Sequence, residues 1–224
     1  MRLSKSETVL HLEMETDMNR RTFATMFAAS AAVALLTAGP LHAEPKVGAP
    51  APAFSAVNTE GKTVNLNDYR GKTVVLEWTN DGCPYVRKHY GSGNMQALQK
   101  KWTDQGIVWL SVISSPPGEQ GFADAARANS LTSERKATPT AVLLDPKQQV
   151  ARAFGATVTP HMYIIKPDGV LAYAGGIDDK PTTRPADVKD AKNFVDDALA
   201  ELKAGRLVSN PATRAYGCTV KYSS

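Results

Sequence analysis

The chain has 224 residues, of which 42% are hydrophobic and 21% are charged, with 16 Gly and 14 Pro. This composition excludes a disordered, a collagen-like and a coiled-coil protein, and it fits one compact domain with an appendage. The 26 basic and 22 acidic residues give a net charge of +4. Because the Lys and Arg are dispersed along the chain, nothing indicates nucleic acid as a partner. Two cysteines exclude a disulfide-dense scaffold and a four-cysteine zinc site.

The amino-terminal part of the chain has the layout of an export signal. An apolar, Ala-rich stretch at 23–36 follows Asn19-Arg20-Arg21 and is followed by a small residue, Ala43. The stretch is shorter than the roughly 20 residues that span a bilayer, so a permanent membrane helix is disfavoured. Arg20-Arg21 also resembles the twin-arginine export pattern. We predict a cleaved signal at 1–43, a periplasmic mature protein and no membrane contact after cleavage, with Met18 as an alternative start.

The rest of the chain alternates between strand-like and helix-like segments. In chain order the pattern first predicts a hairpin over 54–57 and 63–66, a strand over 73–79, a helix from 84 to 90 that bends at Gly91-Ser92-Gly93 and resumes over 95–102, and a strand over 107–113. It then predicts an insertion at 114–139 with a helix over 122–128, a strand over 141–144, a helix over 148–154, hairpin strands over 162–165 and 170–173, and a last helix over 187–204. The apolar face of that helix comprises Val188, Ala191, Val195, Ala198 and Leu202. This order predicts an α/β fold with a central mixed sheet flanked by helices. We expect one domain at 44–204 and a carboxyl-terminal tail at 205–224.

Cys83 occupies a position suited to thiol chemistry. It follows a buried strand directly and precedes Pro84, a residue that suits the first turn of a helix. The positive end of a helix dipole favours thiolate over thiol, and Arg87 lies four residues further on, on the same helical face. Asp81 opposes this effect. We therefore interpret Cys83 as a reactive thiol, with a buried structural thiol as the alternative.

Two blocks of the chain resemble a known family. The stretch VGAPAPAFSAVNTEGKTVNLNDYRGKTVVLEWTNDGCPYV is similar to the opening of thioredoxin-fold redoxins, a group that includes the peroxiredoxins of the alkyl hydroperoxide reductase and thiol-specific antioxidant type. The match continues through AFGATVTPHMYIIKPDGVLAYAGGID, where Thr159-Pro160 stands at the position of that fold's cis-proline. The resemblance implies a thioredoxin-like fold in which Thr159 and Pro160 lie beside Cys83 and shape the face on which a peroxide or a partner disulfide docks.

The sequence also departs from that family. Thioredoxins carry a second cysteine three residues after the first, and here Val86 occupies that position. Peroxiredoxins carry Thr or Ser three residues before the reactive cysteine, and here that residue is Asn80, whose amide, or else Thr79, would have to replace the hydroxyl. The chain most resembles peroxiredoxin-like redoxins that keep the first cysteine followed by Pro and lack the rest of the peroxiredoxin triad.

Cys218 is the second sulfur, and it lies in the tail, in the stretch YGCTVKY. One role for it is resolution: peroxide oxidises Cys83 to a sulfenic acid, and Cys218 condenses with that acid. The alternatives are a static disulfide with Cys83, which an oxidising compartment permits, and a free or intermolecular thiol. Spacing does not decide among these roles, and resolution within one chain or between the chains of a homodimer both remain open.

The two histidines of the mature chain are each open to a structural interpretation as well as a catalytic one. His89 is six residues past Cys83, so an ideal helix turns it away from the sulfur, and we expect it on the surface. His161 follows Pro160 and either approaches Cys83 as a base or packs against the sheet. We predict no metal and no bound cofactor, because position 87 is Arg where copper-delivering relatives repeat a cysteine.

The sequence therefore predicts an exported thiol-dependent oxidoreductase of the peroxiredoxin-like type. Its catalytic residues are Cys83, Cys218, Arg87, Thr159 and Pro160, its substrate is a peroxide or a protein disulfide, and an external thiol reductant recycles it. Two alternatives stay open: a thiol-disulfide exchange protein, and a non-catalytic redoxin-fold binding module in which Cys83 forms at most a static bridge.

Overall fold

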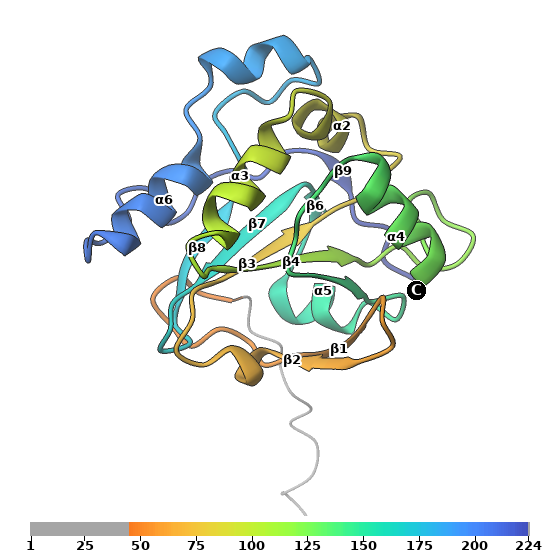
Figure 1. Cartoon of the computed structure of the whole chain (residues 1–224), viewed down its shortest axis with the longest axis horizontal. Coiled ribbons are helices and arrows are strands. Elements are labelled where there is room, and N and C mark those ends of the chain that lie inside the picture. The colour runs from red at the N-terminus through yellow and green to blue at the C-terminus, as the bar shows by residue number, and fades with distance from the viewer. Residues whose placement is uncertain (1–44, 224) are drawn as a thin grey trace, which may run out of the picture. The chain divides into compact units, whose positions relative to one another are not determined.

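The computed structural model describes residues 45–223. The predicted export signal at 1–43 lies outside the described residues. The strands are β1 (Ser55–Asn58), β2 (Thr63–Asn65), β3 (Val74–Trp78), β4 (Val108–Ile113), β5 (Ala141–Leu144), β6 (Val158–Thr159), β7 (His161–Ile165), β8 (Leu171–Gly175) and β9 (Cys218–Thr219). The helices are η1 (Leu66–Tyr69), α2 (Pro84–Gly91), α3 (Asn94–Thr103), α4 (Ala125–Glu134), α5 (Gln149–Phe154), η2 (Pro185–Asp190) and α6 (Phe194–Lys203) (Figure 1).

A seven-stranded mixed sheet forms the centre of the domain, in the order β2-β1-β5-β4-β3-β7-β8. The strands β3, β4 and β5 run parallel, whereas β7 pairs antiparallel with β3 and with β8. The predicted amino-terminal hairpin is β1 and β2, and it pairs through β1 with β5. The predicted central mixed sheet with flanking helices is confirmed.

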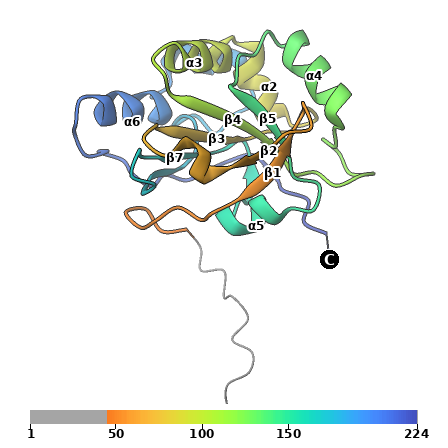
Figure 2. The same ribbon diagram turned by 60° about the horizontal axis from the view of Figure 1, so that its bottom comes forward.

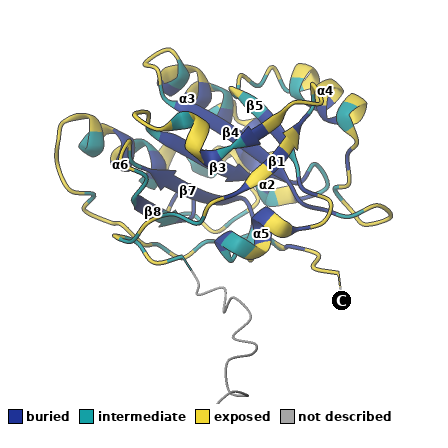
Figure 3. Cartoon of the chain, turned by 90° about the horizontal axis from the view of Figure 1, so that it is seen from below, coloured by how far each residue is buried: buried dark blue, intermediate teal, exposed yellow. Residues whose placement is uncertain are grey.

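The sheet has an apolar core on each face, because successive residues of a strand point to opposite sides. On β3, Val75 packs toward α2, α3 and α6, and Leu76 packs toward α5. Figure 2 shows α5 on one side of the sheet and α2, α3 and α4 on the other. All five residues of β3 are buried, so the strand that leads to Cys83 is held from both sides (Figure 3). Among the described residues, no helix is long and apolar enough to cross a membrane.

The last predicted helix is instead two separate helices, η2 and α6. Asn193 caps α6, because its side-chain oxygen accepts a hydrogen bond from the Asp196 N–H at 3.0 Å. Ala191 is extended, with φ −89° and ψ 140°, so the chain leaves η2 before α6 begins. The prediction of one apolar face over 187–204 is therefore wrong for Val188 and Ala191, which are only half-buried. A capping residue inside the apolar pattern separated the two helices.

The tail after Gly205 is ordered against the domain, although its sequence has no periodicity. Thr213 N–H donates to Ala174 O at 3.1 Å beside β8, and Val220 N–H donates to Thr157 O at 2.9 Å. Between these two points β9 pairs antiparallel with β6. In Figure 1 the dark blue tail crosses from the side of α6 to the carboxyl terminus beside α5. Single contacts with distant segments, which no local pattern encodes, hold it in place.

Candidate functional site

Cys83 lies at the junction that the sequence predicts, between β3 and α2. It is the N-cap residue of α2, Pro84 is the first residue of that helix, and its side chain is fully buried. Asn80 shapes the preceding loop: its side-chain oxygen accepts from Gly82 N–H at 2.8 Å, and its amide donates to Gln120 O at 3.1 Å. Because both ends of this amide are engaged, Asn80 holds the loop instead of facing the sulfur.

The peptide bond between Thr159 and Pro160 is cis, as the resemblance implied, and it lies beside Cys83. The Cys83 thiol donates a hydrogen bond to Thr159 O at 3.0 Å. The Thr159 side-chain hydroxyl is also buried and has no hydrogen-bond partner among the described residues. The structure therefore brings together three of the predicted site residues, Cys83, Thr159 and Pro160.

Cys218 is the fourth predicted residue at this site. Its strand β9 places it opposite Thr159 in the register, and its side chain packs with the apolar cluster that contains Cys83. Both cysteines are free thiols in the structure. Burial raises the pKa of the Cys218 thiol, and its hydrogen bond with Cys83 adds to this rise. Cys218 is partly exposed whereas Cys83 is not, so the two sulfurs differ in access.

Arg87 is the one predicted site residue that points elsewhere. It lies on the exposed side of α2, and its Nε donates to Asp81 O at 2.9 Å. Within residues 45–223 no hydrogen bond or ion pair joins its guanidinium to the Cys83 sulfur. The Asp81 carboxylate pairs instead with Arg135 at 2.7 Å and Arg127 at 3.3 Å. Arg87 therefore braces the loop before Cys83 through its backbone.

His89 is buried, and the expectation of a surface histidine is wrong. Its ring contacts Asn94 Nδ2 at 2.9 Å and the Tyr216 hydroxyl at 3.3 Å. Burial lowers the pKa of His89 to about 4, against the opposing effect of the Asp178 charge, so the ring is neutral near pH 7. Helix α2 turned it away from Cys83 as expected, but α3 and the tail cover that side.

His89 belongs to a buried polar cluster that sequence reasoning missed. Lys88 Nζ lies 2.9 Å from Asp178 Oδ2, with both side chains at most 1% exposed. The Tyr216 hydroxyl donates to the Asp178 carboxylate, and it lies 3.0 Å from Lys88 Nζ. A buried charge pair of this kind needs additional hydrogen bonds, and the Tyr216 hydroxyl supplies one of them. The cluster therefore joins α2, the loop after β8 and the tail two residues before Cys218.

His161 packs against the sheet, which is the second of the two roles expected for it. Its Nδ1 lies 3.2 Å from the Tyr163 hydroxyl and accepts from Thr157 N–H at 3.4 Å. Burial lowers the pKa of His161 to about 4, so the ring is neutral near pH 7. Within residues 45–223 no hydrogen bond or ion pair connects its ring with Cys83.

Glu77 is a second buried polar residue that the apolar strand pattern concealed. Its carboxyl group is fully buried on β3, and burial raises its pKa. The Tyr90 hydroxyl lies 2.7 Å from Oε1, and Trp109 Nε1 and Gln99 Nε2 lie 2.8 and 3.0 Å from Oε2. The sequence of β3 does not alternate between apolar and polar residues, because both faces of this strand are buried, so no pattern indicated that Glu77 is a buried polar residue.

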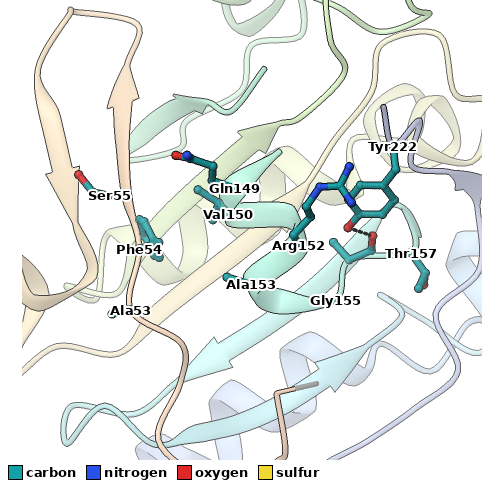
Figure 4. Close-up of a pocket in the computed structure, with 11 residues that line it drawn as sticks. Ala53, Phe54, Ser55, Gln149, Val150, Arg152, Ala153, Gly155, Thr157 and Tyr222 are labelled. Atoms are coloured by element: carbon teal, nitrogen blue, oxygen red, sulfur yellow. Dashed lines mark hydrogen bonds between the residues drawn. The ribbon is translucent and has the colours of Figure 1, made fainter. Parts of the chain in front are cut away.

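A cavity of about 840 Å³ lies away from Cys83. It is lined by residues of α5, of the segment before β1 and of the tail, among them Phe54, Val150, Arg152 and Tyr222 (Figure 4). The described part of the chain holds no cluster of three His, Cys, Asp or Glu side chains that would bind a metal ion. The thiol pair is therefore the site with the clearest chemistry.

The sheet order, the cis-proline beside Cys83 and the flanking helices define a thioredoxin-like fold. A model of the AhpC/TSA family matches residues 47–174, more than half of the chain, and the chain belongs to that family. A structure of a hypothetical protein from Sinorhizobium meliloti has the same fold, with a TM-score of 0.69 and 21% identity over 81% of this chain and 97% of that one. This family assignment makes the chain a thiol redox protein by descent.

Two curated relatives carry names of different activities. The thiol-disulfide oxidoreductase ResA of Bacillus subtilis is 29% identical over 122 residues, which are 54% of this chain and 63% of the relative. The glutathione peroxidase of Lactococcus lactis is 32% identical over 72 residues, which are 32% of this chain and 42% of the relative. The matches thus span less than two thirds of each relative. They agree on the class of thiol oxidoreductases and differ on the substrate.

Proposed function

We propose that the chain is a thiol-dependent peroxidase whose redox pair is Cys83 and Cys218 of the same molecule. One observation carries the proposal: the tail places Cys218 directly against Cys83, although 134 residues separate them in the chain. Cys218 thereby replaces the second cysteine that thioredoxins carry at the position of Val86. The Cys83 sulfur has no accessible surface, and this favours a small oxidant such as a peroxide over a polypeptide.

The proposed reaction has two balanced steps. The Cys83 thiol gives up its proton, and the thiolate attacks one oxygen of the peroxide; the O–O bond breaks, the departing oxygen takes up that proton and leaves as alcohol or water, and Cys83 becomes a sulfenic acid. The Cys218 thiol then attacks that sulfur, an S–S bond forms, and the hydroxyl leaves as water with the thiol proton. Two external thiols reduce the disulfide and are themselves oxidised to a disulfide.

The other site residues act by position in this proposal. The Thr159 carbonyl holds the reduced Cys83 thiol by the hydrogen bond of 3.0 Å, and Pro160 fixes the chain that carries this carbonyl. Arg87 keeps the loop before Cys83 in place through Asp81 O.

We further propose that residues 1–43 direct the protein to the periplasm and are removed, and amino-terminal sequencing of the mature protein tests this.

The test is a trapping experiment with stoichiometric hydrogen peroxide and a sulfenic-acid probe on reduced protein. We expect wild type to pass to a disulfide that intact mass reports as the loss of two hydrogens. Cys218→Ser should accumulate a labelled sulfenic acid on Cys83, and Cys83→Ser should do neither. If Cys83 reacts no faster than a free thiol, peroxide reduction is excluded.

Thiol-disulfide exchange is the second candidate, and the likeness to ResA favours it. In that reaction the Cys83 thiolate attacks a partner disulfide, and Cys218 then attacks the mixed disulfide at Cys83 and releases the reduced partner. A protein that reduces a partner disulfide rapidly but ignores peroxide would establish this candidate. A protein that does neither, with a permanent Cys83–Cys218 bridge, would be a binding module.

A further inference from the structure

The tail forms a strand beside Cys83, and the partly exposed Cys218 lies on that strand. Strand β9 pairs with β6, so that Cys218 and Thr159 lie opposite each other immediately before the cis-proline. Gly217 packs so tightly here that a Cβ atom at its position would collide with the Thr159 carbonyl group. Only glycine allows this approach. The tail therefore takes up the backbone edge beside Cys83.

Residues that do not belong to the thiol site hold this strand in place. The Tyr216 hydroxyl bonds to Asp178 and Lys88, and its ring contacts the Tyr85 ring of α2 at 5.7 Å with edge-to-face geometry. On the other side of β9, Val220 N–H donates to Thr157 O at 2.9 Å. We call Lys88, Asp178 and Tyr216 the tail anchor.

Two kinds of oxidant are affected differently by this arrangement. A polypeptide disulfide reaches a thiol at a sheet edge most readily by adding its own extended backbone to that edge as a strand. The backbone of β6 cannot accept it while β9 is paired there. A small oxidant needs only a path to the sulfur and no backbone pairing.

The geometry points to Tyr216 as a positioning and specificity-determining residue: through the tail anchor it keeps β9 on β6, which holds Cys218 against Cys83 and excludes polypeptide disulfides from Cys83. This inference rests on the proposed function, because it assumes that Cys83 is the reacting thiol. A polypeptide disulfide then reacts with Cys83 only when β9 is released from β6, and the surroundings of the Cys83 sulfur need not change.

The experiment compares two aromatic disulfide probes that differ only in size. In one probe, N-acetylcysteine amide forms a disulfide with an aromatic thiol that is coloured when released. In the other probe, a short unstructured peptide with one cysteine forms a disulfide with the same aromatic thiol. The Cys83 thiolate attacks the probe's cysteine sulfur, the S–S bond breaks, and the aromatic thiolate leaves with the electron pair. All proteins carry Cys218→Ser, so that Cys83 alone reacts.

Two variants release the strand by independent routes. Tyr216→Phe removes the hydroxyl from the tail anchor, and Gly217→Ala creates the collision with Thr159 while leaving the anchor intact. We expect Tyr216→Phe to raise the rate with the peptide probe about tenfold, the effect of losing one hydrogen bond to a charged group. Gly217→Ala should raise that rate in the same direction through the collision, and each variant should raise the rate with the small probe less than about threefold. Tyr69→Phe, in η1, is the matched control and should change neither rate.

The outcomes separate this inference from the proposed function. If both rates rise equally, or if neither rises in either variant, Tyr216 does not set specificity and the inference is overturned. A Tyr216→Phe protein that fails to fold leaves Gly217→Ala to decide. If Cys83 reacts with no probe in any variant and also ignores peroxide, the proposed function itself fails.

Discussion

The two cysteines of the site are held by two very different regions. Cys83 sits at the end of β3, whose five residues are buried in the middle of the sheet. Cys218 sits in a tail that contacts the domain through a few hydrogen bonds, one short strand and the tail anchor. The first region is fixed by the same packing that stabilises the fold, whereas the second is fixed locally. We infer that the tail opens without unfolding the domain.

The largest effect should come from the core region. Leu76 is fully buried in β3, between β4 and β7. Leu76→Ala should lower the free energy of unfolding by about 3 kcal/mol, because it removes apolar contacts and leaves a cavity. Denaturant titration followed by tryptophan fluorescence measures this. A loss below about 1 kcal/mol would mean that β3 does not hold the core.

His161 lies where the two regions meet, and it should make stability depend on pH. Its pKa is lowered from 6.5 to about 4 in the folded state, so the unfolded chain binds more protons between these values. The contribution of His161 to stability should therefore be complete above about pH 6.5 and decrease as the pH falls toward 4, by up to about 3 kcal/mol, in addition to the similar contribution of His89. Unfolding titrations across this range should show a shallower decrease for His161→Gln. Parallel pH profiles would show that the ring is already charged in the fold.

A smaller effect is expected in the tail. Thr213 Oγ1 lies 2.6 Å from the Tyr173 hydroxyl and accepts from Gly176 N–H at 3.1 Å. Thr213→Val should cost about 1 kcal/mol, the usual contribution of such hydrogen bonds, and mostly through local opening. Hydrogen exchange should show faster exchange at Val220 than in wild type and little change at Leu76. Equal acceleration at both amides would contradict the idea that the tail opens separately.

The smallest effect is expected at Arg87, and it distinguishes two roles. Its side chain is exposed and bonds to Asp81 O, so Arg87→Gln should change the free energy of unfolding by less than about 0.5 kcal/mol. The rate of Cys83 with peroxide should fall less than about threefold, because the guanidinium does not contact the sulfur. A decrease of tenfold or more, reversed by Arg87→Lys, would establish instead the charge effect that the sequence suggests.

The same contrast explains how much the sequence could predict. Local patterns located β3, the break at Gly91-Ser92-Gly93 and Cys83 before Pro84, because each of these depends on neighbouring residues. The resemblance located the cis-proline. The role of Tyr216 and the burial of Lys88 and His89 depend on contacts between segments about 90 or more residues apart, which have no period in the sequence. Glu77 stayed hidden because a strand buried on both faces gives no alternation.

The most direct test of the account is a redox titration of the purified protein, with each state mapped by mass spectrometry after alkylation. We predict one reversible transition in which Cys83 and Cys218 lose their thiols together and a single intrachain disulfide forms in a monomer. Cys83→Ser and Cys218→Ser should each abolish the transition. If the two thiols titrate independently, or if only disulfides between chains form, the tail does not supply the partner of Cys83 and the account is wrong.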